Sequence, residues 1–210
     1  MNINDCKEFF RSNGNIESFK DLYGTNDHTL DKQNKRYIRA IELFYEFFPT
    51  RTEISIYSAP GRTEIGGNHT DHQRGVVLAG AVDLDAIAVV AFHNERIVRV
   101  KSEGYNLSEF SLDSLHPNNA DDGTTAIVKG VIAKFVEKGI AVGGMDMYVT
   151  SDVICGGGIS SSAAFETLIG TIIDCQYNNG NSTAFEIAQY GWYAENTFFG
   201  KKCGRLDQTV

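Results

Sequence analysis

The sequence predicts a single α+β domain with a largely antiparallel sheet. Three features support this class: a helical pattern in the first fifty residues, a β-rich stretch after it, and a return to helices in the second half. The 210 residues are enough to bury one substantial core. The order of the elements disfavours a doubly wound parallel sheet, which would need strict alternation of strands and helices.

The first half of the chain predicts helices followed by strands. Residues 31–47 form the better of two helical pieces, and Pro49 stops the pattern. Apolar side chains recur there at helical spacing: Tyr37, Ile38, Ile41, Phe44, Tyr45 and Phe48. From Glu53 onward β-branched residues predict strands in "EISIYSA", "GVVLAGAVDLDAIAVVAF" and "RIVRVKSE". Their short connections are typical of an antiparallel sheet.

The second half predicts helices around one more strand, "GGMDMYVTSDV". Residues 124–138 are expected to be helical, with an apolar face of Ile127, Val131, Ile132 and Phe135. The glycine loop "GGGISSSA" at 156–163 opens a second helix, whose apolar face holds Phe165, Leu168, Ile169, Ile172 and Ile173. A last helix is expected over 182–197.

Charge, cysteine usage and hydropathy exclude several function classes. The formal net charge of −8, with Lys and Arg spread singly, argues against a nucleic-acid partner or a membrane surface. Cys6, Cys155, Cys175 and Cys203 show neither close pairing nor zinc spacing, so we expect reduced, non-catalytic thiols. No apolar run approaches the roughly 20 residues of a membrane span. The first residues lack a secretory pattern, and we expect a cytoplasmic protein.

The glycine loop has two interpretations. Glycines allow a close backbone approach, and Ser160 to Ser162 lie where the helix begins, so amides and hydroxyls converge on a point that suits phosphate. The alternative is a flexible turn with an ordinary serine N-cap. The loop is neither a Walker A motif nor a dinucleotide fingerprint. Three serines after three glycines exceed what a cap requires, which favours phosphate.

A dense polar cluster precedes the longest predicted strand. Six polar residues lie within eleven positions: Arg62, Glu64, Asn68, His69, Asp71 and His72. We expect them largely on a loop, because Gly61, Gly66 and Gly67 interrupt any regular element. A solvated loop is one interpretation. The density of donors and acceptors favours recognition of a polyol, whose hydroxyls both donate and accept hydrogen bonds.

Two carboxylates near the end of the sequence complete the candidate site. Glu195 lies on the last predicted helix and, with a serine hydroxyl, could hold Mg²⁺. Asp207, in "CGRLDQ", could accept a hydroxyl proton while Arg62 offsets developing negative charge. By spacing alone Asp207 is more often a surface aspartate.

Three segments in order resemble one family. "APGRTEIGGNHTDHQRGVVL" resembles the galactokinase signature Gly-Arg-X-Asn-Leu-Ile-Gly-Glu-His-X-Asp-Tyr, and "GGGISSSA" is similar to the second motif of the wider GHMP kinases. "AENTFFGKKCGRLDQ" resembles the galactokinase segment that ends in Gly-Ile-Met-Asp-Gln. The resemblance implies a ribosomal-protein-S5-like α+β domain, in which residues 1–50 form a helical extension and residues 51–210 the catalytic part.

The resemblance also implies an ATP-dependent kinase that phosphorylates the anomeric hydroxyl of galactose. Arg62 would face that hydroxyl and the transferring phosphate, and Asp207 would act as the base. The implied sugar contacts are Asn68, His69, Asp71 and Gly204, together with Arg62 and Asp207. The implied ATP phosphate loop is Gly156, Gly157, Gly158, Ile159, Ser160, Ser161 and Ser162. Ser162 and Glu195 would hold Mg²⁺, and loops around 92–125 would contact adenine.

The sequence departs from the family in two ways. Asn68 stands where the family has a glutamate, Glu64 where it has an asparagine, and His72 where it has a tyrosine. The substrate could therefore also be another hexose, an epimer or an amino sugar. Galactokinases are also about twice as long, so we expect a truncated N-terminal fragment of low activity, without the C-terminal GHMP domain. A non-catalytic sugar- and ATP-binding regulator and a GHMP kinase for another alcohol are the alternatives. The oligomeric state stays open.

Overall fold

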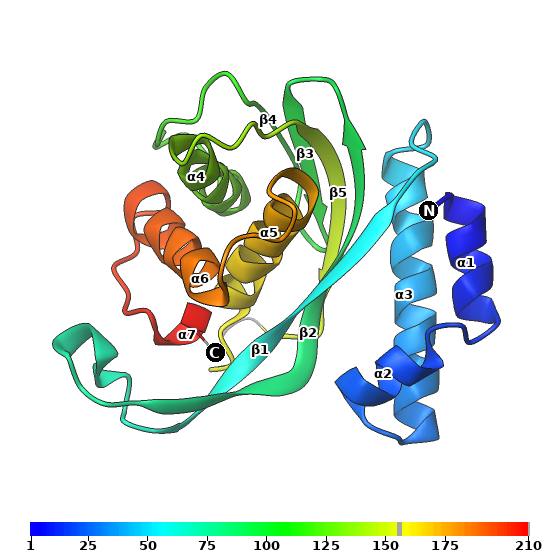
Figure 1. The fold of residues 1–210 in the computed structure, drawn as a ribbon, viewed down its shortest axis with the longest axis horizontal. Coiled ribbons are helices and arrows are strands. Elements are labelled where there is room, and N and C mark those ends of the chain that lie inside the picture. The colour runs from blue at the N-terminus through cyan, green and yellow to red at the C-terminus, as the bar shows by residue number, and fades with distance from the viewer. Residues whose placement is uncertain (155–156, 210) are drawn as a thin grey trace.

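A five-stranded sheet lies between two layers of helices in the computed structural model, which describes residues 1–154 and 157–209 (Figure 1). Helix α3 covers one face of the sheet, and α1 and α2 pack against α3. Helices α4 and α5 cover the other face, and α6 packs over α4 and α5. The helices are α1 Ile3–Arg11, α2 Ile16–Tyr23, α3 Asp27–Phe47, α4 Gly123–Glu137, α5 Ser161–Tyr177, α6 Ala184–Tyr193 and α7 Leu206–Thr209.

The sheet has the order β1-β2-β5-β3-β4. Its strands are β1 Ser55–Gly66, β2 Leu78–His93, β3 Ile97–Ser102, β4 Leu107–Ser111 and β5 Gly144–Ser151. The pairs β1–β2, β2–β5 and β3–β4 are antiparallel, whereas β3 and β5 are parallel. The predicted α+β class with a largely antiparallel sheet is therefore confirmed. The short edge strand β4 has no counterpart among the predicted strands.

The uninterrupted apolar run of β2 has a simple cause, since both faces of the sheet are covered. Alternate residues of a strand point to opposite faces. One set, Ala86, Ala88 and Val90, joins the core beneath α4 and α5. The other set, Ile87, Val89 and Ala91, joins the core formed with α1–α3. The predicted apolar faces of α4 and α5 are likewise largely buried, at Ile127, Val131, Ile132, Phe135, Leu168, Ile169, Ile172 and Ile173. Phe165, predicted on the face of α5, is only half-buried.

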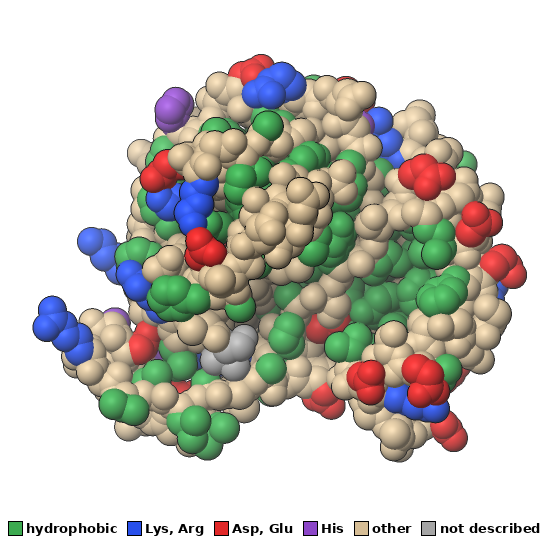
Figure 2. All heavy atoms as spheres, in the orientation of Figure 1, with side chains coloured by type: hydrophobic (Ala, Val, Ile, Leu, Met, Phe, Trp, Pro, Cys, Tyr) green, Lys and Arg blue, Asp and Glu red, His purple; other side chains and the backbone are tan. Residues whose placement is uncertain are grey.

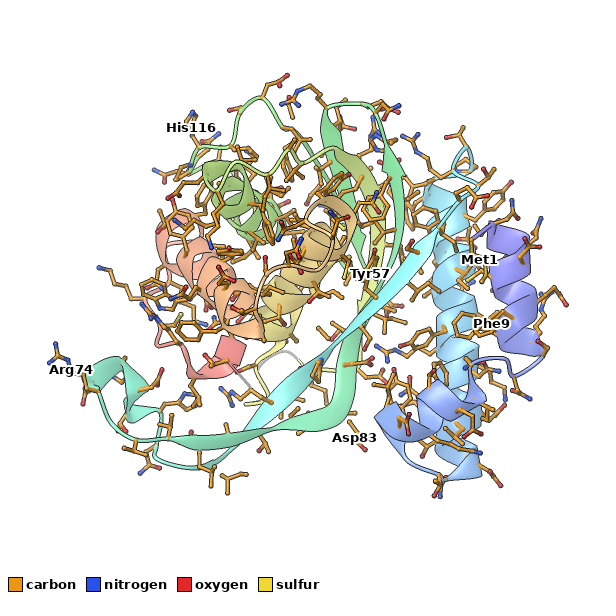
Figure 3. All side chains as sticks on the ribbon, in the orientation of Figure 1. Met1, Phe9, Tyr57, Arg74, Asp83 and His116 are labelled. Atoms are coloured by element: carbon orange, nitrogen blue, oxygen red, sulfur yellow. The ribbon has the colours of Figure 1, made fainter. Side chains whose placement is uncertain are left out.

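The expectation of a loop around the polar cluster is wrong for Arg62 and Glu64. Both lie on β1, which continues through Gly61 and ends at Gly66. The strand accommodates these residues because β1 is an edge strand with two register shifts, between Pro60 and Arg62 and between Glu64 and Gly66. The residues that follow do form a loop, with a 3₁₀ turn at Thr70–Gln73. Arg74 lies at its far tip (Figure 3).

The last predicted helix is divided in the structure. Helix α6 begins at a capping box formed by Thr183 and Glu186, and a π-helical turn, Ala194–Phe198, follows it directly. Single π turns within helices are frequent at functional sites. This turn carries Glu195, one of the predicted site residues.

The N-terminal helices are fastened to the sheet through Asp85, which is 4% exposed. Its carboxylate accepts hydrogen bonds from the Tyr23 hydroxyl at 2.7 Å, the Ser58 hydroxyl at 2.5 Å and the Arg36 guanidinium at 2.5 Å. Burial, with Tyr37 and Asp85 nearby, raises the pKa of Tyr23, so its hydroxyl keeps the proton that it donates. One buried carboxylate thus joins α2, α3, β1 and β2.

The surface agrees with the acidic composition. On the face drawn in Figure 2, Lys and Arg side chains stand in small separate groups among acidic ones, so this face carries no broad basic patch. Within residues 1–154 and 157–209, no helix has both the length and the apolar character needed to cross a membrane.

Replacing Asp85 by alanine should lower the free energy of unfolding by about 3–5 kcal/mol, because the largely buried Arg36 guanidinium would lose its nearest counter-charge and keep only the longer contact with Asp152 among the described acidic groups. Chemical denaturation of the 210-residue chain measures this loss. Asp83→Ala is the matched control, since Asp83 is exposed on the same strand (Figure 3). Equal stability of the two variants would contradict the anchoring role of Asp85.

Candidate active site

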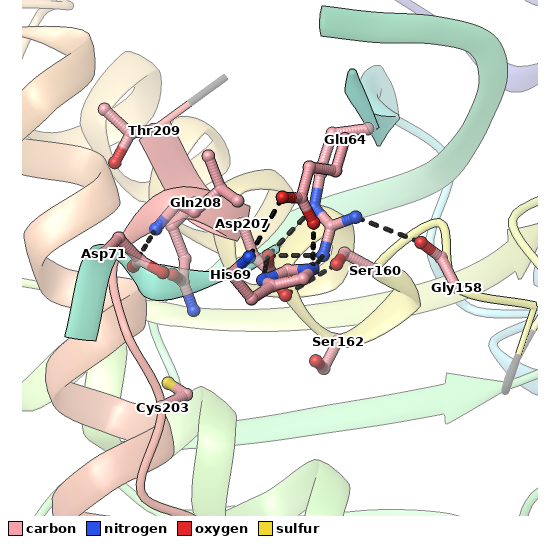
Figure 4. A network of polar contacts seen from close by, with 12 residues as sticks. Glu64, His69, Asp71, Gly158, Ser160, Ser162, Cys203, Asp207, Gln208 and Thr209 are labelled. Atoms are coloured by element: carbon pink, nitrogen blue, oxygen red, sulfur yellow. Dashed lines mark hydrogen bonds and ion pairs between the residues drawn. The ribbon is translucent and has the colours of Figure 1, made fainter. Parts of the chain in front are cut away.

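The predicted site residues converge from four segments that are distant in sequence. The end of β1, the loop after it, the glycine loop before α5 and the short helix α7 meet in one network of polar contacts (Figure 4). Of the predicted residues, Gly156 lies outside the described part of the chain, as does Cys155.

Arg62 is the centre of the network and is 5% exposed. Its Nε donates to Asp207 Oδ1 at 2.9 Å, and its Nη2 donates to the same oxygen. Its Nη1 donates to the carbonyl of Gly158 at 3.0 Å. The guanidinium therefore connects the predicted base to the predicted phosphate loop. Gly61 permits this approach, because a Cβ there would lie 2.9 Å from the Ile159 carbonyl oxygen.

The second oxygen of Asp207 binds the glycine loop directly. Ser160 Oγ donates to Asp207 Oδ2 at 2.6 Å. Ser160 occupies the N-cap position of α5, but it is left-handed, with φ at 53°, and its side chain makes no cap hydrogen bond. The interpretation of this loop as an ordinary serine cap is therefore wrong for Ser160. Its hydroxyl serves the site instead.

His69 joins the same network through its ring and its backbone. Arg62 Nη2 donates to His69 Nε2 at 3.1 Å, and the backbone amide of His69 donates to Glu64 Oε1 at 2.9 Å. Glu64 Oε2 lies 3.2 Å from the same ring nitrogen. Asn68, by contrast, is exposed and left-handed, with φ at 53°. His72 contacts its own loop, with Nδ1 2.7 Å from the His69 carbonyl oxygen.

Asp71 and Gly204 are in contact. Asp71 Oδ2 accepts the backbone amides of Arg205 at 2.7 Å and Leu206 at 3.0 Å. A Cβ on Gly204 would collide with the Asp71 carboxylate, so only glycine fits. Asp71 thereby fixes the start of α7, one residue before Asp207.

Glu195 forms a second centre, 2% exposed, beside the first turn of α5. Ser162 Oγ donates to Glu195 Oε1 at 3.3 Å, and Lys201 Nζ donates to the same oxygen at 2.8 Å. Cys203 Sγ donates to Glu195 Oε2 at 2.9 Å, and Gln208 Nε2 donates to it at 3.1 Å. Sequence reasoning paired Ser162 with Glu195 and missed Lys201, Cys203 and Gln208.

The oxygens of Ser162 and Glu195 suit one magnesium ion. Octahedral Mg²⁺ holds oxygens at about 2.0–2.1 Å, which places neighbouring ligands about 3 Å apart. The two atoms lie 3.3 Å apart. Among residues 1–154 and 157–209, no group of three or more His, Cys, Asp and Glu side chains could hold a metal ion. A magnesium site here therefore depends on the serine hydroxyl and on groups from outside the protein, such as water or phosphate.

The described cysteines, Cys6, Cys175 and Cys203, are free thiols. Burial raises the pKa of the Cys203 thiol to about 12, and its hydrogen bond and proximity to Glu195 add to this effect. At neutral pH the thiol is protonated, which suits its role as a donor to Glu195 and makes it a poor nucleophile.

A cavity of about 540 Å³ opens beside the start of α5. Its lining includes Ser161 and Ser162 and the side chains of Tyr105, Ile154 and Phe199. From the sequence we expect adenine contacts in the loops around 92–125, without a specific residue. The sequence signal for the lining was the aromatic residues Tyr105, in "EGYN", and Phe199, in "FFGKK". Both are exposed in the structure and line this cavity.

Replacing Asp71 by alanine should release the 205–209 segment, because two backbone amides lose their acceptor. Hydrogen exchange by mass spectrometry should then show faster exchange in residues 204–209 and unchanged protection in α5. Asp71→Asn, which retains a side-chain oxygen, is the matched control and should stay close to the parent chain. Unchanged exchange in Asp71→Ala would overturn the anchoring of α7 by Asp71.

Comparison with known proteins identifies two family models along the chain. The model for the galactokinase galactose-binding signature matches residues 42–92, and the model for the GHMP kinase N-terminal domain matches residues 126–210. Together they include the polar cluster, the glycine loop and the segment that carries Asp207.

Solved structures share this fold. Galactokinase from Lactococcus lactis, crystallised with galactose, superposes with a TM-score of 0.72 and 29% identity, over 80% of this chain and 44% of the galactokinase. Mevalonate kinase from Methanococcus jannaschii superposes with a TM-score of 0.62 and 18% identity, over 75% of this chain and 50% of the kinase. The chain thus spans about half the length of either kinase or less.

These matches agree with the resemblance predicted from the three motifs. The order of the two family matches is the order of the motifs, and the superposition on galactokinase covers 80% of the chain. The chain therefore carries the galactokinase galactose-binding signature and a GHMP kinase N-terminal domain, and its fold matches that of galactokinase.

Proposed function

We propose that the protein to which this chain belongs transfers the γ-phosphate of ATP to the anomeric hydroxyl of galactose and so serves galactose metabolism. One observation carries the proposal: the Arg62 guanidinium bonds both the Asp207 carboxylate and the Gly158 carbonyl of the glycine loop. Phosphoryl transfer needs a positioned base, a cation near the developing charge and a phosphate-binding loop. The Arg62 network supplies all three in direct contact.

Asp207 is the proposed base. Both of its oxygens already accept hydrogen bonds, one from Arg62 and the other from Ser160. A sugar hydroxyl that replaces the Ser160 hydroxyl at Oδ2 would donate its proton to the carboxylate, while Arg62 stays on Oδ1. The guanidinium then lies beside the attacking oxygen and offsets the charge that develops on the phosphoryl group.

The start of α5 is the proposed phosphate site. The helix has 17 residues, and its first amides and the hydroxyls of Ser160 and Ser162 lie beside the glycine loop. The cavity next to it has the size and apolar lining of a site for a nucleoside. We assign the adenine end to the part of the cavity between Tyr105 and Phe199.

Ser162 and Glu195 are the proposed magnesium ligands. When bound, Mg²⁺ would neutralise charge on the ATP phosphates and help to orient them. Lys201 holds the same Glu195 oxygen in the structure, so its ammonium would have to move toward the phosphates when the ion binds. A lysine with 58% of its side chain exposed can make that movement.

A different hexose is the second candidate substrate. Glu64, not Asn68, directs a carboxylate at the His69 ring, whereas the galactokinase signature has the glutamate at the other position. A regulator without catalysis is less favoured. The residues proposed for catalysis and metal binding are all present, and they contact one another in the pairs Arg62–Asp207 and Ser162–Glu195. We further propose that the chain is the N-terminal part of a longer cytoplasmic kinase without a nucleic-acid partner.

Asp207→Asn in the full-length protein should lower kcat by about 10²–10⁴-fold, the usual contribution of a general base, while the Kd for ATP changes little. A coupled ADP-release assay against hexoses and small alcohols measures both turnover and substrate choice. Asp83→Asn, on the exposed side of β2, is the control and should retain full activity. Unchanged turnover in Asp207→Asn would sink the assignment, and absence of turnover with every alcohol in the wild type would favour the regulator.

The 210-residue chain alone should bind ATP but turn over little sugar. It spans 44% of the galactokinase that it resembles, so part of the cleft would come from residues beyond those matched. The same ADP-release assay on this chain tests the expectation. Turnover equal to that of the full-length protein would refute the need for a second domain.

A further inference from the structure

A buried carboxyl group lies directly behind the candidate site. Glu166, on α5, has no exposed surface and faces α6 and α7. Gln208 Nε2 donates to Glu166 Oε2 at 2.8 Å and to Glu195 Oε2 at 3.1 Å. Gly191 makes room for this arrangement, since a Cβ there would lie 2.9 Å from the Cβ of Glu166. One amide group therefore bridges two buried carboxyl groups.

The hydrogen-bond pattern indicates which of the two carries a proton. Glu166 Oε1 and Gln208 Oε1 are both buried and have no partner among the described atoms. An ionised Glu166 would offer acceptors only, so both oxygens would stay unpaired at a cost of several kcal/mol. A protonated Glu166 carries a hydroxyl at Oε1, which can donate to Gln208 Oε1. Gln208 Nε2 already donates to Glu166 Oε2, so the acid and the amide would then form two hydrogen bonds.

The charges around Glu166 support the neutral form. Burial raises the pKa of Glu166 well above its usual range, and the nearby Glu195 raises it further. The cations beside the site are engaged elsewhere, because Lys201 pairs with Glu195 and Arg62 with Asp207. A second buried negative charge would have no counter-ion of its own.

We propose that Glu166 is a neutral carboxylic acid paired with the amide of Gln208, and that this pair positions Glu195 and the helix that carries Asp207. Glu166 is thus a positioning residue. The hydroxyl of the protonated acid donates to Gln208 Oε1 and so fixes the orientation of the amide. In that orientation one amide N–H of Gln208 donates to Glu166 and the other donates to Glu195. The link to magnesium rests on the proposed function, whereas the acid–amide pair does not.

Carbon NMR on the 210-residue chain tests the pair itself. With ¹³C at the glutamate Cδ, the Glu166 signal, assigned by its loss in E166Q, should keep the chemical shift of a protonated acid from pH 6 to pH 8. Surface glutamates such as Glu17 should show the shift of a carboxylate over that range. A carboxylate shift for Glu166 at pH 7 would overturn the proposal, whether or not the protein is a kinase.

Metal binding tests the positioning role. The probe is Mn²⁺ with ATP, followed by electron paramagnetic resonance of the same chain. E166Q can form an amide–amide pair with Gln208, so its Kd for Mn²⁺ with ATP should stay within about twofold of the wild-type value. E166L removes the pair, so its Kd should rise about 10–100-fold, the usual effect of losing a residue that hydrogen-bonds to a metal ligand. Equal binding by E166L, or an equal loss in E166Q, would overturn the role.

A third variant guards against a folding defect in E166L. Q208E keeps the size of the side chain and a carbonyl for Glu166 but has one donor at most, so it should also lose Mn²⁺ affinity. Thermal melts and the NMR spectrum show whether each variant is folded. If the wild-type chain itself binds no Mn²⁺ with ATP, the proposed metal site of this chain fails and the positioning role fails with it, while the NMR result still decides the acid–amide pair.

Discussion

The site depends on one ion pair, between Arg62 on the edge strand and Asp207 on the last short helix. The two residues are 145 positions apart in sequence, and the arginine is almost fully buried. A guanidinium withdrawn from water needs a counter-charge and further acceptors, or its desolvation destabilises the fold. Asp207, the Gly158 carbonyl and His69 supply them. The same contacts that satisfy this cation also bring Asp207, the proposed base, to the glycine loop.

The rest of the structure keeps that pair in place. Asp71 binds the backbone at the start of α7, and Gln208 fastens the following turn to Glu166 and Glu195. On the opposite face of the sheet, Asp85 joins the N-terminal helices to β2. Left-handed backbone at Asn68, His69 and Ser160 lies around the ion pair. Non-glycine residues adopt this conformation mainly where surrounding contacts enforce it, and often at functional sites.

Much of the fold and of the candidate site could be predicted from the sequence. The apolar faces of α4 and α5 and the glycine loop follow local patterns, whereas the expected pairing of Ser162 with Glu195 came from the family resemblance. The loop assignment of Arg62 failed because a bulged edge strand tolerates glycine and proline that a central strand would not. The roles of Glu166 and Gln208 had no signal, since a glutamate among apolar helix positions resembles any surface residue until neighbouring helices enclose it.

By itself the sequence determined the fold class, the resemblance to galactokinase and the choice of candidate site residues, because helical period, strand alternation and motif spacing are local properties. Only the tertiary structure decided which groups touch. Contacts across 145 residues depend on how the layers pack, and packing also sets burial. Packing brings Asp207 against Arg62, so that it is an ion-pair partner instead of a free surface aspartate, and burial raises the pKa values of Cys203 and Glu166.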